Sequence, residues 1–212
     1  MRMGTYYKAL LLIRLGVSTK SSAVLDVGGL DGHWLSQQDC GIKVCLDLSP
    51  VKEYGNTHYI QGDALKLPLR DRCIDQSFAF DVMEHVSDDE LLVRELLRVV
   101  KNGGKVTLSV PNKKIRIFPS FLTNWVSRRW GHNKCNGYLE EELESILPRE
   151  LYRKTQYVRA FWYRLLYFPL RLVWGIVPQF GRQLIKAVAC LDGAYSEGDN
   201  GYLIITIAKN SN

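Results

Sequence analysis

The residues best suited to chemistry lie in one short stretch near the start of the chain. The run Ala23–Val27 is apolar apart from Asp26, and it leads directly into Gly28, Gly29 and Gly32. An apolar run of this length is typical of a buried parallel strand, and glycine lets the backbone turn tightly and approach a ligand closely. A strand that ends in such a turn, followed by a helix, presents backbone N–H groups to a bound cofactor. The stretch therefore predicts a ligand-binding loop.

Three more acidic side chains follow apolar runs further along the chain. Asp47 ends the run Lys43–Asp47, 21 residues after Asp26, and Asp63 and Asp81 follow the next two runs. Parallel strands end at the same edge of a sheet, so these acids and the glycine loop are expected to lie together. The spacing of Asp47 matches that of the carboxylate that accepts from ribose hydroxyls in a nucleotide-binding βαβ unit. For a lone acid at a strand end, the alternative is a simple cap.

The elements that position these residues follow from hydrophobic periodicity and from turn signals. Ser87–Glu90 forms a capping box that starts a helix with Leu92 and Leu96 on its apolar face, and Gly103 ends it. Two further short helices are expected at Asp31–Gln38 and Tyr138–Leu147. Strands are expected at Ala23–Val27, Lys43–Asp47, His58–Ala64, Ile74–Phe80, Lys105–Val110, Thr155–Phe161 and Gly201–Lys209.

Taken together, these blocks resemble those of the class I S-adenosylmethionine-dependent methyltransferases. Motif I of that family is an acidic residue followed by G-x-G-x-G, and Asp26, Gly28 and Gly32 match it, with Leu30 in place of the middle glycine. The segment Leu67–Phe78 resembles a later block of the family: a Leu-Pro pair, a short charged turn, and an aspartate before a Ser-Phe strand. The resemblance covers about residues 23–112.

The resemblance implies a single α/β domain with a Rossmann-like three-layer sandwich and a mostly parallel sheet of seven strands. It divides residues 1–212 into four parts. These are an N-terminal helix in 1–22, a cofactor-binding core in 23–112, lid and substrate-side insertions in 113–200, and a last strand in 201–209.

The resemblance also implies S-adenosyl-L-methionine as co-substrate and methyl transfer as the activity. Asp47 would accept from the ribose hydroxyls, and Asp63 from the adenine amino group. The implied cofactor-binding set is Asp26, Gly28, Gly29, Gly32, Asp47, Leu48, Asp63, Ala64 and Phe80. In-line methyl transfer depends on positioning and water exclusion more than on covalent help from the protein.

Two histidines are candidates for a general base, because imidazole titrates near neutral pH. His85 follows the fourth predicted strand, and His132 lies in the 111–137 segment; a purely structural role is the alternative for His85. Asp81, Glu84 and His85 also resemble the metal-binding string of some O-methyltransferases. Relatives without a metal carry the same string, so the prediction is that no metal is bound.

Two other functions compete with methyl transfer. One is a non-catalytic binding or scaffold protein that retains the cofactor pocket. The other is an NAD-dependent oxidoreductase, whose G-x-G-x-x-G fingerprint read from Gly28 needs glycine where Leu30 and His33 stand. The sequence therefore disfavours NAD.

Composition indicates a cytoplasmic protein with an acidic partner or surface. The five cysteines are odd in number and scattered, which suits a reducing compartment. Residues 111–190 hold 14 Lys and Arg against 5 Asp and Glu. Because no nucleic-acid recognition motif accompanies this charge, nucleic acid is not the expected partner.

The stretch 161–191 mixes aromatic side chains with Arg164, Arg171, Arg182 and Lys186. Its longest run without charge, 172–181, is shorter than the roughly 20 residues needed to span a bilayer. One interpretation is a helix pair at the inner face of the membrane that covers a lipid-linked acceptor, bent or divided by Pro169. The other is a lid packed on the domain's own core.

Overall fold

A computed structural model describes residues 3–14, 20–30, 32–50, 55–129, 137–148, 150–192 and 201–210. The backbone divides into two compact units. Unit 1 comprises Met1–Ser18, Pro111–Gly137 and Gln156–Leu203. Unit 2 comprises Thr19–Val110, Tyr138–Thr155 and Ile204–Asn212.

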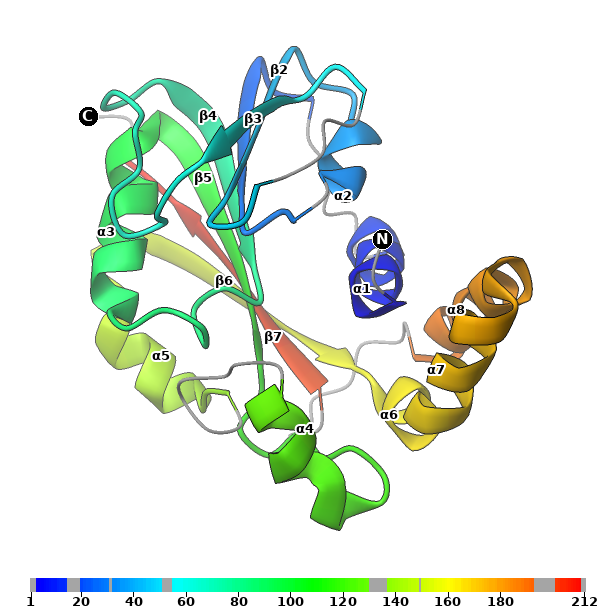
Figure 1. Ribbon diagram of the computed structural model, residues 1–212. Coiled ribbons are helices and arrows are strands. Elements are labelled where there is room, and N and C mark those ends of the chain that lie inside the picture. The colour runs from blue at the N-terminus through cyan, green and yellow to red at the C-terminus, as the bar shows by residue number, and fades with distance from the viewer. Residues whose placement is uncertain are drawn as a thin grey trace. The chain divides into compact units, whose positions relative to one another are not determined.

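Four parallel strands form the first part of the sheet, and all belong to unit 2 (Figure 1). They are β1 (Ala23–Val27), β2 (Ile42–Asp47), β3 (His58–Gln61) and β4 (Ile74–Phe80). Every residue of β1 is buried, as expected for a central strand of a parallel sheet. The bounds of β1 and β4 are those predicted from the sequence, whereas β3 ends three residues early.

Three longer strands complete the sheet: β5 (Val100–Pro111), β6 (Tyr152–Arg159) and β7 (Gly201–Ala208). The strands hydrogen-bond in the order β3-β2-β1-β4-β5-β7-β6. This confirms the predicted Rossmann-like α/β architecture with a mostly parallel seven-stranded sheet.

Three helices accompany the strands in unit 2: α2 (His33–Ser36), α3 (Asp89–Val99) and α5 (Glu140–Ile146). The amphipathic α3 contacts α5 and buries Leu92 and Leu96 completely. The capping-box prediction is off by one residue, because Asp88 rather than Ser87 is the N-cap. Its carboxylate accepts from the Leu91 N–H at 2.8 Å.

Helices dominate unit 1: α1 (Met3–Arg14), α4 (Thr123–Arg129), α6 (Phe161–Leu165), α7 (Tyr167–Ile176) and α8 (Pro178–Asp192), with a 3₁₀ turn at Ser120–Leu122. The predicted helix pair is thus three helices. The first break falls at Leu166, and Pro169 sits in the first turn of α7, where an N–H has no helical partner. Pro178 begins α8, a position that suits the fixed proline φ.

A buried carboxylate holds three of these helices together. Asp192, fully buried at the end of α8, accepts from the Tyr7 hydroxyl and from the Trp162 and Tyr163 N–H groups, each at 2.8 Å. The Tyr7 and Tyr163 rings stack with centroids 3.9 Å apart. Burial raises the pKa of Tyr7, and the charge of Asp192 raises it further, so the hydroxyl stays a donor. The Asp192 side chain therefore links the end of α8 to both α1 and α6.

No helix within the described residues is both long and apolar enough to cross a membrane.

Candidate functional site

The carboxyl ends of β1, β2, β3 and β4 lie at one edge of the parallel part of the sheet. The last residues of these strands and the segments that follow them carry all the residues predicted to bind the cofactor, and all lie in unit 2. Open α/β sheets bind their ligands at this edge.

Three described residues of the loop after β1 have a left-handed backbone. Gly28, Leu30 and Gly32 have φ values of 71°, 54° and 61°, all in the left-handed region. Leu30 thus adopts a backbone conformation that glycine takes freely and that costs a residue with a Cβ about 1–2 kcal/mol. Its N–H donates to the Asp47 carboxylate at 3.1 Å, which offsets part of that cost. The position of the middle glycine of the motif is therefore occupied by a leucine with left-handed backbone, held by Asp47.

Gly29 is required for a different reason, namely space. A Cβ at this position would lie 2.5 Å from Asp26 Oδ2 and 2.7 Å from Cys45 Sγ. Both side chains are buried in the sheet below the turn, so neither can move aside cheaply. Asp26 therefore lies directly beneath the loop, and Gly29 lets the backbone pass over its carboxylate.

Asp47 joins the ends of β1 and β2. Its Oδ2 accepts from the Leu30 N–H at 3.1 Å and its Oδ1 from the Ser49 N–H at 2.9 Å. Its own carbonyl accepts from the Gly62 N–H at 3.0 Å, which ties the end of β3 to β2. Each carboxylate oxygen can accept a second hydrogen bond, so Asp47 retains capacity for ligand hydroxyls. The next residue, Leu48, is 70% exposed.

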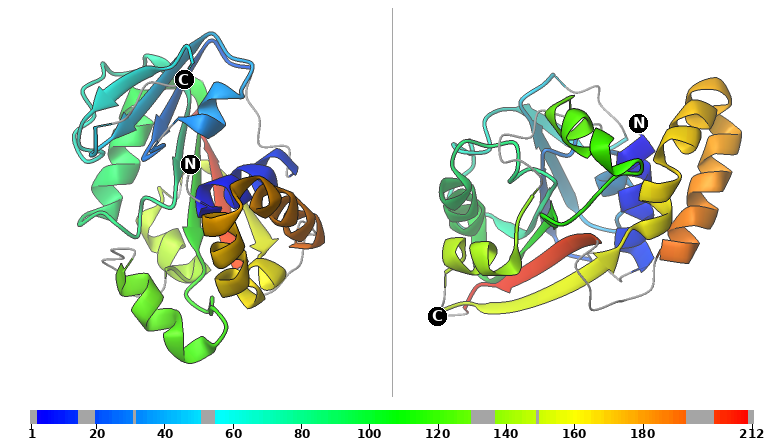
Figure 2. Two further views of the ribbon diagram at one scale, coloured as in Figure 1. Left: turned by 45° about the vertical axis from the view of Figure 1, so that its right-hand side comes forward. Right: turned by 90° about the horizontal axis from the view of Figure 1, so that it is seen from below.

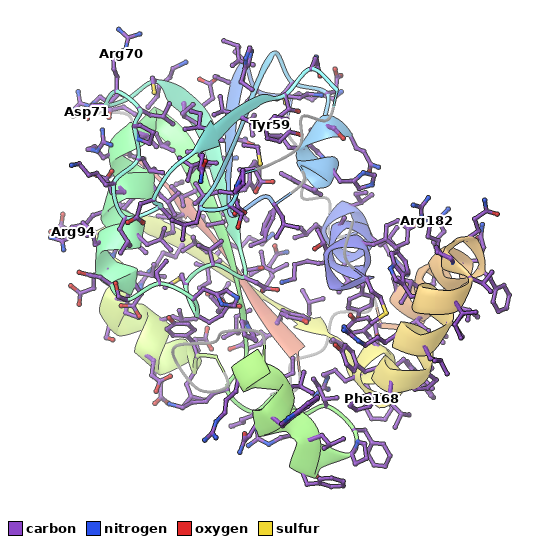
Figure 3. The ribbon with its side chains drawn as sticks, in the orientation of Figure 1. Tyr59, Arg70, Asp71, Arg94, Phe168 and Arg182 are labelled. Atoms are coloured by element: carbon purple, nitrogen blue, oxygen red, sulfur yellow. The ribbon has the colours of Figure 1, made fainter. Side chains whose placement is uncertain are left out.

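The predicted adenine-contacting loop follows β3. Asp63 is exposed and its Oδ1 accepts from the Leu65 N–H at 2.9 Å, whereas Ala64 is buried. Tyr59 of β3 (Figure 3) reaches toward the start of α2, with its hydroxyl 2.5 Å from where a Cβ on Gly32 would lie. Sequence reasoning missed Tyr59, because nothing in the pattern places β3 against the glycine loop.

Arg98 on α3 binds the segment 67–71, which follows this loop, through hydrogen bonds. Arg98 donates to Glu95 Oε1 at 2.7 Å, to the carbonyls of Leu67 and Leu69 at 3.0 and 2.9 Å, and to Asp71 at 2.6 Å. The hydrogen bonds from Arg98 hold the pKa of Glu95 below its usual range, more than offsetting its partial burial. This cluster fixes the segment after Asp63 to α3.

The segment after β4 begins with a strained residue. Asp81 has a φ of 53°, its N–H donates to the Ser109 carbonyl at 2.9 Å, and its Oδ1 accepts from the Ser109 hydroxyl at 3.3 Å. Phe80 and Trp34 of α2 meet edge to face with ring centroids 5.0 Å apart. The contact joins the end of β4 to the helix that follows the glycine loop.

The candidate base His85 is exposed, four residues after Asp81, and its N–H donates to the Val82 carbonyl at 2.9 Å. His132 lies outside the described residues. Within the described ranges, no three His, Cys, Asp or Glu side chains gather in a way that could hold a metal ion. Asp81, Glu84 and His85 therefore do not form such a group.

Tyr138 hydrogen-bonds to the segment that follows β4. The sequence analysis did not single it out as a site residue. Its buried hydroxyl lies 3.0 Å from the Met83 carbonyl and 3.2 Å from Asp89 Oδ2, and it donates to them. Burial, with the nearby charge of Asp89, raises the pKa of Tyr138 and keeps it a donor. The only signal in the sequence was its place before a short acidic helix.

Comparison with known proteins agrees with this geometry. Residues 25–108 match the family model described as a methyltransferase domain. An uncharacterized methyltransferase of Mycobacteroides abscessus is 28% identical over 147 residues, which cover 58% of this chain and 57% of that protein. A malonyl-[acyl-carrier protein] O-methyltransferase of Marinomonas sp. is 43% identical over 103 residues, covering 42% and 38%. The chain spans about half the length of the curated relatives it matches.

Solved structures show the same fold. A SAM-dependent methyltransferase from Thermotoga maritima, a possible histamine N-methyltransferase, has a TM-score of 0.64 at 14% identity, covering 98% of this chain and 91% of that one. Haemonchus contortus phosphoethanolamine N-methyltransferase 2, in complex with phosphomonomethylethanolamine and S-adenosylhomocysteine, has a TM-score of 0.65 at 17% identity, covering 96% and 53%. Residues 25–108 thus match a methyltransferase domain, and the fold of the chain is that of solved S-adenosylmethionine-dependent methyltransferases.

Proposed function

We propose that the chain binds S-adenosyl-L-methionine at the carboxyl edge of β1–β4 and transfers its methyl group to a small-molecule or lipid-linked acceptor. One observation carries the proposal: the Leu30 N–H in the glycine loop donates to the Asp47 carboxylate at the end of β2. It sets a fixed backbone turn beside a carboxylate that can still accept hydrogen bonds.

The residues at this edge fit an adenosyl ligand. Gly29 lets the backbone run over Asp26 where any Cβ would clash, as a loop that cradles a ligand requires. In this proposal Asp47, which has spare acceptor capacity, accepts from ribose hydroxyls, and the exposed Asp63 accepts from the adenine amino group. When bound, S-adenosylmethionine supplies a methyl group activated by its sulfonium.

The chain's own contribution is positioning and proton management. Asp47 and the loop after β1 orient the donor, and the Arg98 cluster holds the loop that carries Asp63. His85 is exposed after β4 and is proposed as the base that takes the acceptor's proton. Activity measured against pH in wild type and His85→Gln distinguishes this from a structural histidine, which would leave the profile unchanged.

The class of acceptor is proposed from two lines of support. Relatives with named acceptors include a phosphoethanolamine N-methyltransferase and a malonyl-[acyl-carrier protein] O-methyltransferase, so this family accepts both small and carrier-linked molecules. In this chain, α7 and α8 expose apolar side chains beside cations, which suits an apolar or lipid-linked acceptor. A cytoplasmic location is proposed from the cysteines, four of which are free thiols in the described residues.

A second function is kept because the proposed catalytic group is a single histidine. A non-catalytic binding protein would use the same loop and Asp47 without turnover. An NAD-dependent oxidoreductase is disfavoured, because Leu30 and His33 replace two glycines of its fingerprint.

The test is incubation of the chain with a cell extract and methyl-labelled S-adenosylmethionine, followed by mass spectrometry. The proposal predicts release of S-adenosylhomocysteine and one class of labelled product, enriched in the organic phase if the acceptor is lipid-linked. Donor binding without any labelled product would support the non-catalytic function instead.

A further inference from the structure

The junction of α7 and α8 exposes a cluster of apolar side chains. Leu172, Ile176, Val177 and Phe180, here called the apolar tip, are 65%, 70%, 49% and 56% exposed. Leu172 and Ile176 are four residues apart and so share one face of α7. Single exposed apolar residues are ordinary on a protein surface, but a contiguous group at one end of a helical hairpin marks a surface that binds something.

The side chains of the apolar tip are not those that pack α8 against the rest of unit 1. The buried stripe of α8 consists of other residues, Gly181, Ile185, Val188 and Ala189, and the helix contacts α1, α6 and α7. α7 and α8 run side by side (Figure 2). They approach so closely at Gly181 that a Cβ there would lie 2.9 Å from Trp174 Cα.

The junction itself is ordered by backbone hydrogen bonds. The Val177 N–H donates to the Val173 carbonyl at 2.8 Å, and the Val177 carbonyl accepts from the Gly181 N–H at 2.9 Å. A preformed turn presents its side chains without a further cost in backbone entropy when it binds.

The charged side chains of the stretch 151–191, which includes the apolar tip, are all cationic. Arg171, Arg182 and Lys186 are exposed, and Arg182 is labelled in Figure 3. Residues 151–191 contain no Asp or Glu, and the Asp192 that follows is buried with its three donors. Arg164, the fourth cation of the stretch 161–191, does not flank the tip, because it is buried and donates to the Ala160 and Arg116 carbonyls.

From these observations we propose that the apolar tip, flanked by Arg171, Arg182 and Lys186, docks unit 1 on an anionic membrane surface. Aliphatic and aromatic side chains beside cations, with no acid between them, match the boundary between hydrocarbon and anionic head groups. A second copy of the chain would present the same cations, and like charges facing each other oppose association. This inference does not depend on methyl transfer, since the tip is separate from the proposed donor-binding residues in sequence.

Vesicle flotation of the full chain tests the proposal. Vesicles of phosphatidylcholine alone are compared with vesicles of phosphatidylcholine and phosphatidylglycerol in equal amounts. The chain is expected to float with the mixed vesicles only, and less of it as salt is raised, because salt screens the cations. The double variant Ile176→Ser/Phe180→Ser is expected to lower the vesicle-bound fraction about tenfold or more.

The matched control is Leu191→Ser, which removes a side chain 61% exposed at the other end of α8 and should leave flotation unchanged. Arg182→Glu/Lys186→Glu should abolish the preference for anionic vesicles. Urea unfolding, measured in parallel, should be equal in all variants and reports that they are folded. The proposal is overturned if wild type stays in the soluble fraction with both vesicles, or if the double variant floats as wild type does. It is equally overturned if light scattering shows that wild type is a dimer and the double variant a monomer, and neither protein floats with vesicles.

Discussion

Replacing Asp47 perturbs both the glycine loop and the proposed ribose contact. The side chain is 9% exposed and accepts from two backbone N–H groups, those of Leu30 and Ser49. Asp47→Ala removes the carboxylate oxygens that accept from these two N–H groups, and with them the proposed acceptor of the ribose hydroxyls. A hydrogen bond to a charged group is worth about 1.5–3 kcal/mol, so binding of S-adenosylhomocysteine should weaken about 10- to 150-fold.

Asp47→Asn refines the expectation. The amide keeps one acceptor oxygen but turns an NH₂ group toward the N–H of either Leu30 or Ser49, so one contact is lost and the two donors face each other. Binding should fall between wild type and Asp47→Ala. Titration calorimetry gives the affinities, and urea unfolding shows how much of each protein is folded under the same conditions.

The control for charge is Asp39→Ala, because Asp39 is exposed in unit 2 and removing it changes the net charge equally. It should bind as wild type does. If folded Asp47→Ala binds within about threefold of wild type, or if Asp39→Ala weakens binding to the same degree, the assignment of Asp47 is refuted.

Three further predictions concern unit 1, the Arg98 cluster and metal dependence. Asp192→Ala leaves three donors without their acceptor, two of them buried, and should lower the free energy of unfolding by on the order of 3 kcal/mol, measured in urea, whereas an effect below about 1 kcal/mol would contradict the network. The pKa of Glu95 is lowered in the folded state chiefly by Arg98, so its stabilising contribution is present above its unfolded pKa of about 4.3 and is lost as pH falls through the lower folded value. Glu95→Gln should therefore be less stable than wild type at pH near 7, and the difference should shrink below pH of about 4. EDTA should leave methyl transfer unchanged, and loss of activity restored by Mg²⁺ or Zn²⁺ would instead favour the Asp81, Glu84 and His85 string as a metal site.

The elements that were predictable are those with a strong local signal. Ala23–Val27 is a largely apolar run that leads into glycines, and Ile74–Phe80 lies between a charged turn and Asp81; both strands appear with the predicted bounds. The α3 cap shifts from Ser87 to Asp88 because neighbouring side chains of similar capping strength compete, and tertiary packing chooses between them.

The parts that were not predictable depend on contacts between distant residues. No local pattern pairs Asp192 with Tyr7 or Tyr138 with the Met83 carbonyl, although both contacts are buried. The left-handed backbone of Leu30 was not predictable for the same reason. Its N–H donates to Asp47, which lies 17 residues further along the chain, and no local pattern indicates that contact.

The most direct test of the central claim is titration calorimetry of the wild-type chain with S-adenosylhomocysteine and, separately, with NAD⁺. The glycine loop and Asp47 predict one site that binds S-adenosylhomocysteine at least about tenfold more tightly than NAD⁺. No measurable binding of S-adenosylhomocysteine, or a preference for NAD⁺, would contradict the account.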